Sequence, residues 1–294
     1  YGYGTVLDGG FGQTRAMGGV SYGVRSPQYI NANNPASYTS IDSLNFRFEA
    51  GASFQISDLK GNDARTSELD GNLEFLAFHF PIKKWMAFSF GIHPYSIVGY
   101  DFERTETVAS TISDGEQTTT YKYNGSGGIT QLYAGVAFKP CEWFSLGGNF
   151  QFNFGNISHV SMSTFDTEKY RTYFATTMER VVQVKDVSGN FGVQGTIPMK
   201  NNSNVVVGGV VQLKSKVNAD ATQTIITTDT TILNFDNNFD LPLYFGLGFA
   251  YTFLDRWLVG IDYKKEMWSD ARFFGDRSFY DRSKISAGGQ FLPD

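Results

Sequence analysis

The chain has 294 residues, of which 27 are Phe, 16 are Tyr and 32 are Gly, against one Cys and three His. No apolar run approaches the roughly 18 residues that a membrane-spanning helix requires, which excludes a helical membrane protein. The formal net charge of −5 argues against nucleic acid as a partner, because nucleic acid binds basic surfaces.

Residues 1–43 come first and predict no strand. They are rich in Gly, Ala, Ser and Asn and show no sustained alternation of apolar and polar residues. The segment begins at Tyr1 with neither Met nor an apolar leader, which fits export by a signal peptide that has been removed.

The first predicted strand, residues 44–57, alternates strictly. Its even-numbered residues from Phe46 to Ile56 are all Phe, Ala or Ile, whereas its odd-numbered residues from Asn45 to Ser57 are polar or Gly. Successive side chains of a strand point to opposite faces, so the two faces meet different environments. Similar alternation recurs and predicts ten strands, at about 44–57, 71–82, 85–101, 118–139, 142–156, 184–198, 204–218, 236–253, 257–268 and 281–291.

The connections between these strands are alternately short and long. Short ones lie at 81–85, 139–143, 198–204 and 253–257, and long polar ones near 57–71, 101–117, 155–185, 215–238 and 267–280. This arrangement is typical of an all-β, antiparallel up-and-down barrel in an outer membrane, whose apolar face contacts lipid and whose polar face lines the lumen. The alternative is a soluble β-sandwich, in which strands usually have about 5–6 residues.

Two stretches carry a resemblance to a known family. The segment GQTRAMGGVSYGVRSPQYINANNPASYTS at 12–40, with Asn34-Pro35-Ala36 just before the first strand, resembles the N-terminal segment of the long-chain fatty-acid transporter (FadL) family of outer-membrane proteins. The hairpin at 124–155 is also similar to that family. The resemblance implies a fourteen-stranded barrel whose N-terminal segment plugs the lumen. Hydrophobic substrates would enter from outside and leave through a lateral opening or a rearranged plug.

On this resemblance we expect residues 1–43 to form an N-terminal plug and residues 44–294 to form the barrel. The plug residues would include Arg15, Met17, Asn34, Pro35 and Ala36. The chain ends where the tenth strand ends, so we expect about four more strands in the native protein. A complete ten-stranded barrel is the alternative.

The sequence offers little for catalysis. An outer-membrane aspartyl-type protease is similar in length and strand number, but it needs a carboxylate and an imidazole that activate water together. His79, His93 and His159 each lack an acidic residue within two positions, and no Cys/His cluster indicates a metal site. We therefore predict no catalytic residue, no metal and no cofactor.

The inward face supplies the candidate ligand or lumen residues: Arg47, Glu49, Tyr133 and Tyr244. The leading hypothesis is a passive transporter for fatty-acid-like hydrophobic molecules in the Gram-negative outer membrane. The alternative is a structural accessory barrel in a larger outer-membrane complex, which the mostly polar inward face favours. Expected partners are outer-membrane lipid, a hydrophobic small molecule and other outer-membrane proteins.

Overall fold

The computed structural model describes residues 2–8, 10–41, 46–60, 65–109, 116–166, 175–236 and 239–293. The first two residues of the predicted strand 44–57, and residues 1, 9, 42 and 43 of the expected plug, lie outside these ranges. Within them, no helix has the length and apolar character needed to cross a membrane.

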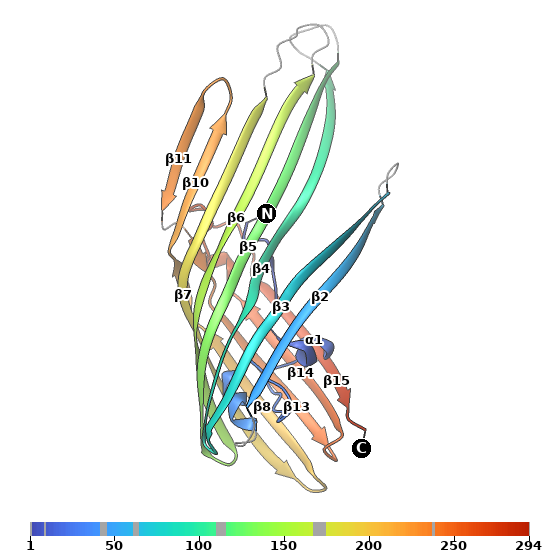
Figure 1. Ribbon diagram of the computed structural model, residues 1–294, viewed down its shortest axis with the longest axis vertical. Helices are drawn as coiled ribbons and strands as arrows, with labels where there is room; N and C mark the ends of the chain where they lie inside the picture. Colours follow the sequence, from blue (N-terminus) through green and yellow to red (C-terminus); the bar gives the residue numbers. More distant parts are fainter. Residues whose placement is uncertain are drawn as a thin grey trace.

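Ten long strands form one antiparallel path in which each is hydrogen-bonded to the next (Figure 1). The path runs β15-β14-β13-β8-β7-β6-β5-β4-β3-β2, so neighbours in space follow each other along the chain apart from the insertion between β8 and β13. All ten predicted strands are present. Their bounds are Arg47–Lys60 (β2), Arg65–Lys83 (β3), Met86–Ala109 (β4), Glu116–Cys141 (β5), Phe144–Asp166 (β6), Thr176–Met199 (β7), Ser203–Gln212 (β8), Tyr244–Phe253 (β13), Trp257–Glu266 (β14) and Arg282–Phe291 (β15).

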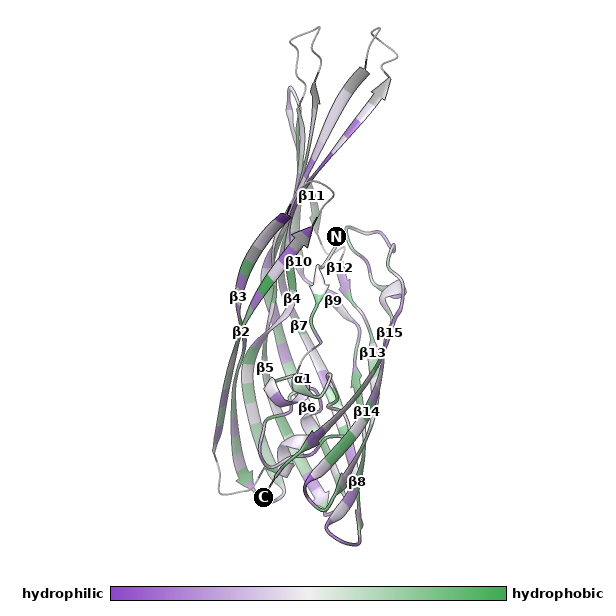
Figure 2. Cartoon of the chain, turned by 90° about the vertical axis from the view of Figure 1, so that its right-hand side faces the viewer, coloured by the Kyte–Doolittle hydropathy of each residue, from purple (hydrophilic) through white to green (hydrophobic). Residues whose placement is uncertain are grey.

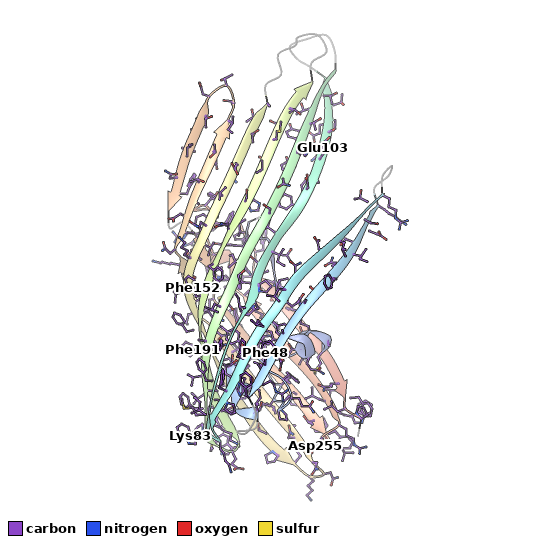
Figure 3. The ribbon with its side chains drawn as sticks, in the orientation of Figure 1. Phe48, Lys83, Glu103, Phe152, Phe191 and Asp255 are labelled. Carbon is purple, nitrogen blue, oxygen red and sulfur yellow. The ribbon has the colours of Figure 1, made fainter. Side chains whose placement is uncertain are left out.

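The predicted facing of these strands is confirmed. Phe48 on β2 and Phe150 on β6 are 51% and 59% exposed on the outer face, while Asn149 and Asn153 between the β6 phenylalanines are buried. Figure 3 shows the outer side chains of Phe152 and Phe191 projecting from the middle of the sheet. An apolar side chain left exposed in this repeated pattern indicates a surface that meets lipid rather than water.

Several predicted loops are strands instead. β4, β5, β6 and β7 continue far beyond the apolar band, and the segment after β8 adds the hairpin β10 (Ala219–Ile226) and β11 (Thr230–Asp236) beside β7 (Figure 1). A short two-stranded sheet joins β9 (Ser215–Val217) to β12 (Phe239–Leu241). The alternation that marks a strand ends where the lipid contact ends, although Thr, Tyr and Val still favour strand pairing there.

The N-terminal segment lies inside the curve of the sheet (Figure 2). It contains β1 (Thr5–Val6), the helix α1 (Gly12–Ala16) and the 3-10 helix η1 (Pro35–Ser40); a second 3-10 helix, η2 (Trp268–Asp270), precedes β15. Apolar residues of this segment, such as Ile30 and Tyr38, are fully buried together with inward side chains of the strands. The hydrophobic core therefore lies on the concave face of the sheet. This core was not predicted, because most inward positions of the strands are polar.

Candidate functional site: the inner face of the sheet

The Asn34-Pro35-Ala36 motif fixes the end of the N-terminal segment to β7. Asn34 caps η1, because its side-chain oxygen accepts a hydrogen bond from the Ala36 amide at 3.1 Å. Its amide group donates to the carbonyls of Tyr22, at 2.7 Å, and Val193 of β7, at 3.3 Å. Pro35 stands at the start of the helix, where its missing N–H costs no hydrogen bond. One buried asparagine thus joins three parts of the chain.

Inward carboxylates on the sheet bind the backbone of the segment. Asp262 of β14 accepts from the amides of Ser21, at 2.6 Å, and Tyr22, at 2.9 Å. Glu49 of β2 accepts from the amide of Ile30 at 2.8 Å. Hydrogen bonds to a charged acceptor are the stronger kind, about 1.5–3 kcal/mol each. The segment is therefore attached to β2 at one end of the ten-strand path and to β14, the strand next to the other end.

A buried arginine in the segment makes a second set of contacts. The Arg25 guanidinium donates to Gln194 of β7 at 3.1 Å, to Ser145 of β6, and to the segment's own Ala36 carbonyl at 3.3 Å and Thr39 hydroxyl at 3.1 Å. Burial lowers the pKa of Arg25 to about 10, so the side chain remains charged at neutral pH. Sequence reasoning missed this residue, although it is one of only two Lys or Arg residues in the segment 1–43, which was a usable signal.

The predicted lumen residues divide into two groups. Arg47 donates to the carbonyls of Pro27, at 3.1 Å, and Gln28, so Arg47 and Glu49 both contact the N-terminal segment. Tyr133 is almost fully buried, with its hydroxyl 3.2 Å from that of Ser89. Tyr244 lines the same small inner cavity as Tyr133, with its ring under the Lys264 ammonium at 4.5 Å.

The remaining predicted plug residues also face the sheet. Arg15 forms an ion pair with Glu74 of β3 and does not join Arg47 and Glu49. Met17 is buried, and its carbonyl lies so close to Gly288 of β15 that a side chain there would overlap it. Arg15 and Met17 thus contact different strands of the wall, β3 and β15. Their shared role in the structure is contact between the segment and the wall.

The sheet has a lateral gap between β3 and β4. The two strands pair from Lys83 and Met86 up to Leu76 and Ile92, and in the described part of the chain no pair joins them beyond that point. There β3 carries a bulge, because Phe75 opposes Gly51 and Leu73 opposes Ala52, so that Glu74 is left over. A bulge bends its strand, and β2 and β3 lean away from β4 in Figure 1. A cavity of about 460 Å³ lies at the gap, lined by residues that include Leu73, Ile97 and Phe154.

β1 occupies part of the edge that β3 leaves. Thr5 and Val6 pair with Ile97 and Ser96 of β4, and the Leu7 amide donates to the Tyr95 carbonyl at 2.9 Å. Arg15 meanwhile holds the bulge residue of β3. The N-terminal segment therefore contacts both sides of the gap.

A second cavity, of about 400 Å³, lies further toward the long connections. Its lining includes Tyr100, Tyr123, Phe273 and Phe279, with His159, Met178, Ser161 and Arg180. His159 Nε2 lies 2.9 Å from the Gly2 carbonyl, which only accepts, so Nε2–H donates to it and Nδ1 accepts from the Tyr100 hydroxyl at 2.8 Å. The cavity is aromatic, with one permanent cation at its wall.

Comparison with known proteins now decides the family. The sequence model of the BamG family matches residues 1–294. The chain belongs to the BamG family. The FadL-family prediction was therefore wrong at the level of the family, although the fold it implied is present in this BamG-family chain. No curated protein matches the sequence significantly.

Solved structures show which fold the BamG-family chain shares. It is similar to the Pseudomonas putida toluene transporter TodX, with a TM-score of 0.61 and 17% identity over 100% of this chain and 80% of TodX. The Ralstonia pickettii toluene transporter TbuX gives 0.53 and 16% over 99% and 78%, and a Pseudomonas aeruginosa FadL homologue gives 0.55 and 14% over 95% and 75%. At these identities the likeness establishes the fold, a transmembrane antiparallel β-barrel architecture.

Within the described ranges of this BamG-family chain, no group of three or more His, Cys, Asp or Glu side chains could hold a metal ion. His79 is buried with both ring nitrogens lacking a hydrogen-bond partner, and its ring is tilted against that of Tyr38 with ring centroids 6.0 Å apart. His93 lines the cavity at the gap, and His159 lines the aromatic cavity.

Proposed function

We propose that the protein is an outer-membrane transporter that passes hydrophobic small molecules by diffusion. The observation that carries the proposal is the pair of large cavities, one aromatic and near the long connections, the other at the lateral gap. Between them run β1 and the N-terminal segment, which would act as a plug. A hydrophobic molecule would bind in the first cavity, and displacement of β1 would open its way to the gap and the lipid. No covalent step is needed.

The fold and its neighbours support this proposal at a coarser level. TodX and TbuX are named as toluene transporters, and they share this architecture at low sequence identity. Among the described lining residues Arg180 is the one permanent cation, and it stands beside aromatic rings, which suits a ligand with an apolar body and one anionic or polar end.

The experiment compares two adjacent residues of β6. Ser161 lines the aromatic cavity, whereas Met162 is exposed on the opposite face of the strand. Ser161→Phe fills the cavity and should lower uptake of radiolabelled toluene and of a medium-chain fatty acid by intact cells at least several-fold. Met162→Phe adds similar bulk outside and should leave uptake unchanged. Equal uptake by both variants and the unmodified protein would refute ligand passage through this cavity.

A second candidate function has its own support. The inner cavity below β1 has a volume of only about 40 Å³, enough for one or two waters, because the N-terminal segment fills the concave face. A filled interior and membership of the BamG family both favour an accessory barrel subunit of a larger outer-membrane complex. Purification in a mild detergent should then yield a stoichiometric protein partner, while deletion of the gene leaves hydrocarbon uptake unchanged.

A further inference from the structure

The side of β4 that faces the gap is an open strand edge. On its other side β4 pairs with β5 without a break from Ile97 opposite Gly128 to Ala109 opposite Glu116. On the gap side, within the described residues, β3 pairs only as far as Ile92 and β1 covers only Ser96 and Ile97. Among the described strands, none pairs with this side of β4 beyond Ile97, and Figure 3 shows Glu103 on this upper stretch.

The direction of the unpaired groups follows from the contact with β1. The Tyr95 carbonyl accepts from Leu7 on the gap side, and Ile97 is paired with Thr5 there. Along an antiparallel strand the backbone groups of alternate residues point to the same side. Gly99, Asp101, Glu103, Thr105 and Thr107 thus present their N–H and C=O groups to the gap. β1 demonstrates that this edge accepts an added antiparallel strand.

The edge is charged, but it has none of the backbone features that usually block strand addition. Exposed edges are normally protected by Pro, charged side chains (especially Lys), bulges or very short length. Residues 98–107 contain neither Pro nor Lys, and their register with β5 is continuous. The closure of the gap by β3 is opposed by the bulge at Glu74, which Arg15 holds.

The charge of the edge indicates what it would bind. Residues 98–107 carry three acidic residues, Asp101, Glu103 and Glu106, against the single cation Arg104, which pairs with Glu106. A complementary strand would carry Lys or Arg at positions opposite Asp101 and Glu103. Beyond the apolar band water can satisfy these backbone groups, but among binding partners an extended polypeptide is the one that offers a matching row of donors and acceptors.

We propose that the edge of β4 from Val98 to Thr107 binds an extended, basic segment of another outer-membrane protein by strand addition. The added strand would continue the line that β1 begins. This interaction does not depend on the passage of a ligand, because it uses the outer part of the edge, above β1.

The first test is hydrogen–deuterium exchange of the full chain in native outer-membrane vesicles and after purification in detergent. The amides of Gly99, Asp101, Glu103, Thr105 and Thr107 should exchange roughly ten-fold more slowly in the vesicles. β11 is the internal control, because among the described strands it pairs only with β10, and its exchange should not change. Fast exchange of the β4 edge in both samples would refute the proposal. Slow exchange of the β4 edge in both samples would also refute it, because β3 would then close the gap. Slower exchange of β11 in the vesicles would refute it as well, because the membrane would then cover both edges in general.

The second test uses charge. Replacing Asp101 and Glu103 together by Lys should remove the protection in vesicles. Glu179→Lys on β7, which is paired on both sides by β6 and β10, is the matched control and should keep it. Protection that survives the double replacement would contradict a basic partner strand, and loss in the Glu179 variant would show that the effect is not specific to the edge.

Discussion

At the scale of single residues, the N-terminal segment is held by charged groups that bind its backbone. Asp262 and Glu49 accept from main-chain amides, and Arg25 and Arg47 donate to main-chain carbonyls. Such bonds do not depend on the side chains of the segment. They do depend on the course of the main chain, so a small displacement of the backbone breaks several of them at once.

Asp8 gives this attachment a dependence on pH. Although burial raises its pKa, a hydrogen bond from Lys284 and the charges of Lys264 and Arg282 outweigh burial and hold the pKa of Asp8 below its ordinary value of 3.8. The stabilisation is therefore fully present above the ordinary value and is lost as the pH falls through the lowered one. Limited proteolysis of the N-terminal segment should accelerate at such acidic pH. In Asp8→Asn, cleavage should be faster already at neutral pH and should lose this part of its pH dependence.

Two adjacent glycines of β8 test the fit of the segment against the wall. A Cβ at Gly208 would overlap the Tyr22 carbonyl, whereas a Cβ at Gly209 meets its nearest neighbour, Val193, at 3.5 Å. Gly208→Ala should displace the segment and lower the free energy of unfolding by about 1–3 kcal/mol. Gly209→Ala should change it by less than about 0.5 kcal/mol. Heat-modifiability on gels and denaturant titration measure both, and equal effects would contradict the close approach.

At the scale of the strand, the face on which a residue lies determines how much a charged substitution there destabilises the protein. The outer side chains of β6 form a continuous apolar row, and the buried polar residues between them contact other strands or the N-terminal segment. The two rows are one residue apart in sequence. One row contacts lipid and the other contacts protein. Whether a polar substitution stabilises or destabilises the protein therefore depends on which row the residue belongs to.

Phe150→Arg places a charge in the middle of that apolar row. The expected loss of stability in the membrane is about 2–4 kcal/mol, because the guanidinium has no partner in lipid. Thr105→Arg, above the apolar band on β4, should cost close to nothing. Refolding into lipid vesicles over a urea series measures the difference. If Phe150→Arg is tolerated as well as Thr105→Arg, the outer face of β6 does not contact lipid.

At the scale of the whole molecule, the sheet and the N-terminal segment share one core. Three buried apolar clusters lie on the concave side, and the segment contributes to all of them. The outer face is stabilised by lipid instead. The interior of this protein is therefore the part that resembles a soluble domain.

Deletion of residues 1–32 tests the role of this interior. The ten-strand sheet should still insert, because its outer face and its strand pairing are unchanged. Ion conductance in planar bilayers should rise, since the polar inner wall would be exposed to water. Conductance equal to that of the intact chain, in a deletion variant that folds, would show that the segment does not obstruct the lumen.

The sequence by itself determined the strands and their facing. An apolar–polar alternation with a period of two survives only where one face meets lipid and the other does not, so β2, β6 and β13 were predictable from their own residues. The position of Asn34-Pro35-Ala36 just before β2 also indicated an N-terminal segment of a particular kind. Beyond the apolar band both faces of a strand are polar, and the signal for the upper parts of β4 to β7 disappeared.

Only the tertiary structure decided how these parts meet. The ion pair of Arg15 with Glu74 and the pairing of β1 with β4 join residues about 60 to 90 positions apart, and no local pattern encodes such contacts. The same holds for Asp262, whose hydrogen bonds to Ser21 and Tyr22 span 241 and 240 residues. The alternation of apolar and polar residues along a strand specifies whether a side chain faces lipid or the interior. The gap, the cavities and the seat of the N-terminal segment arise from contacts between distant parts of the chain, and these exist only once the sheet has curved around that segment.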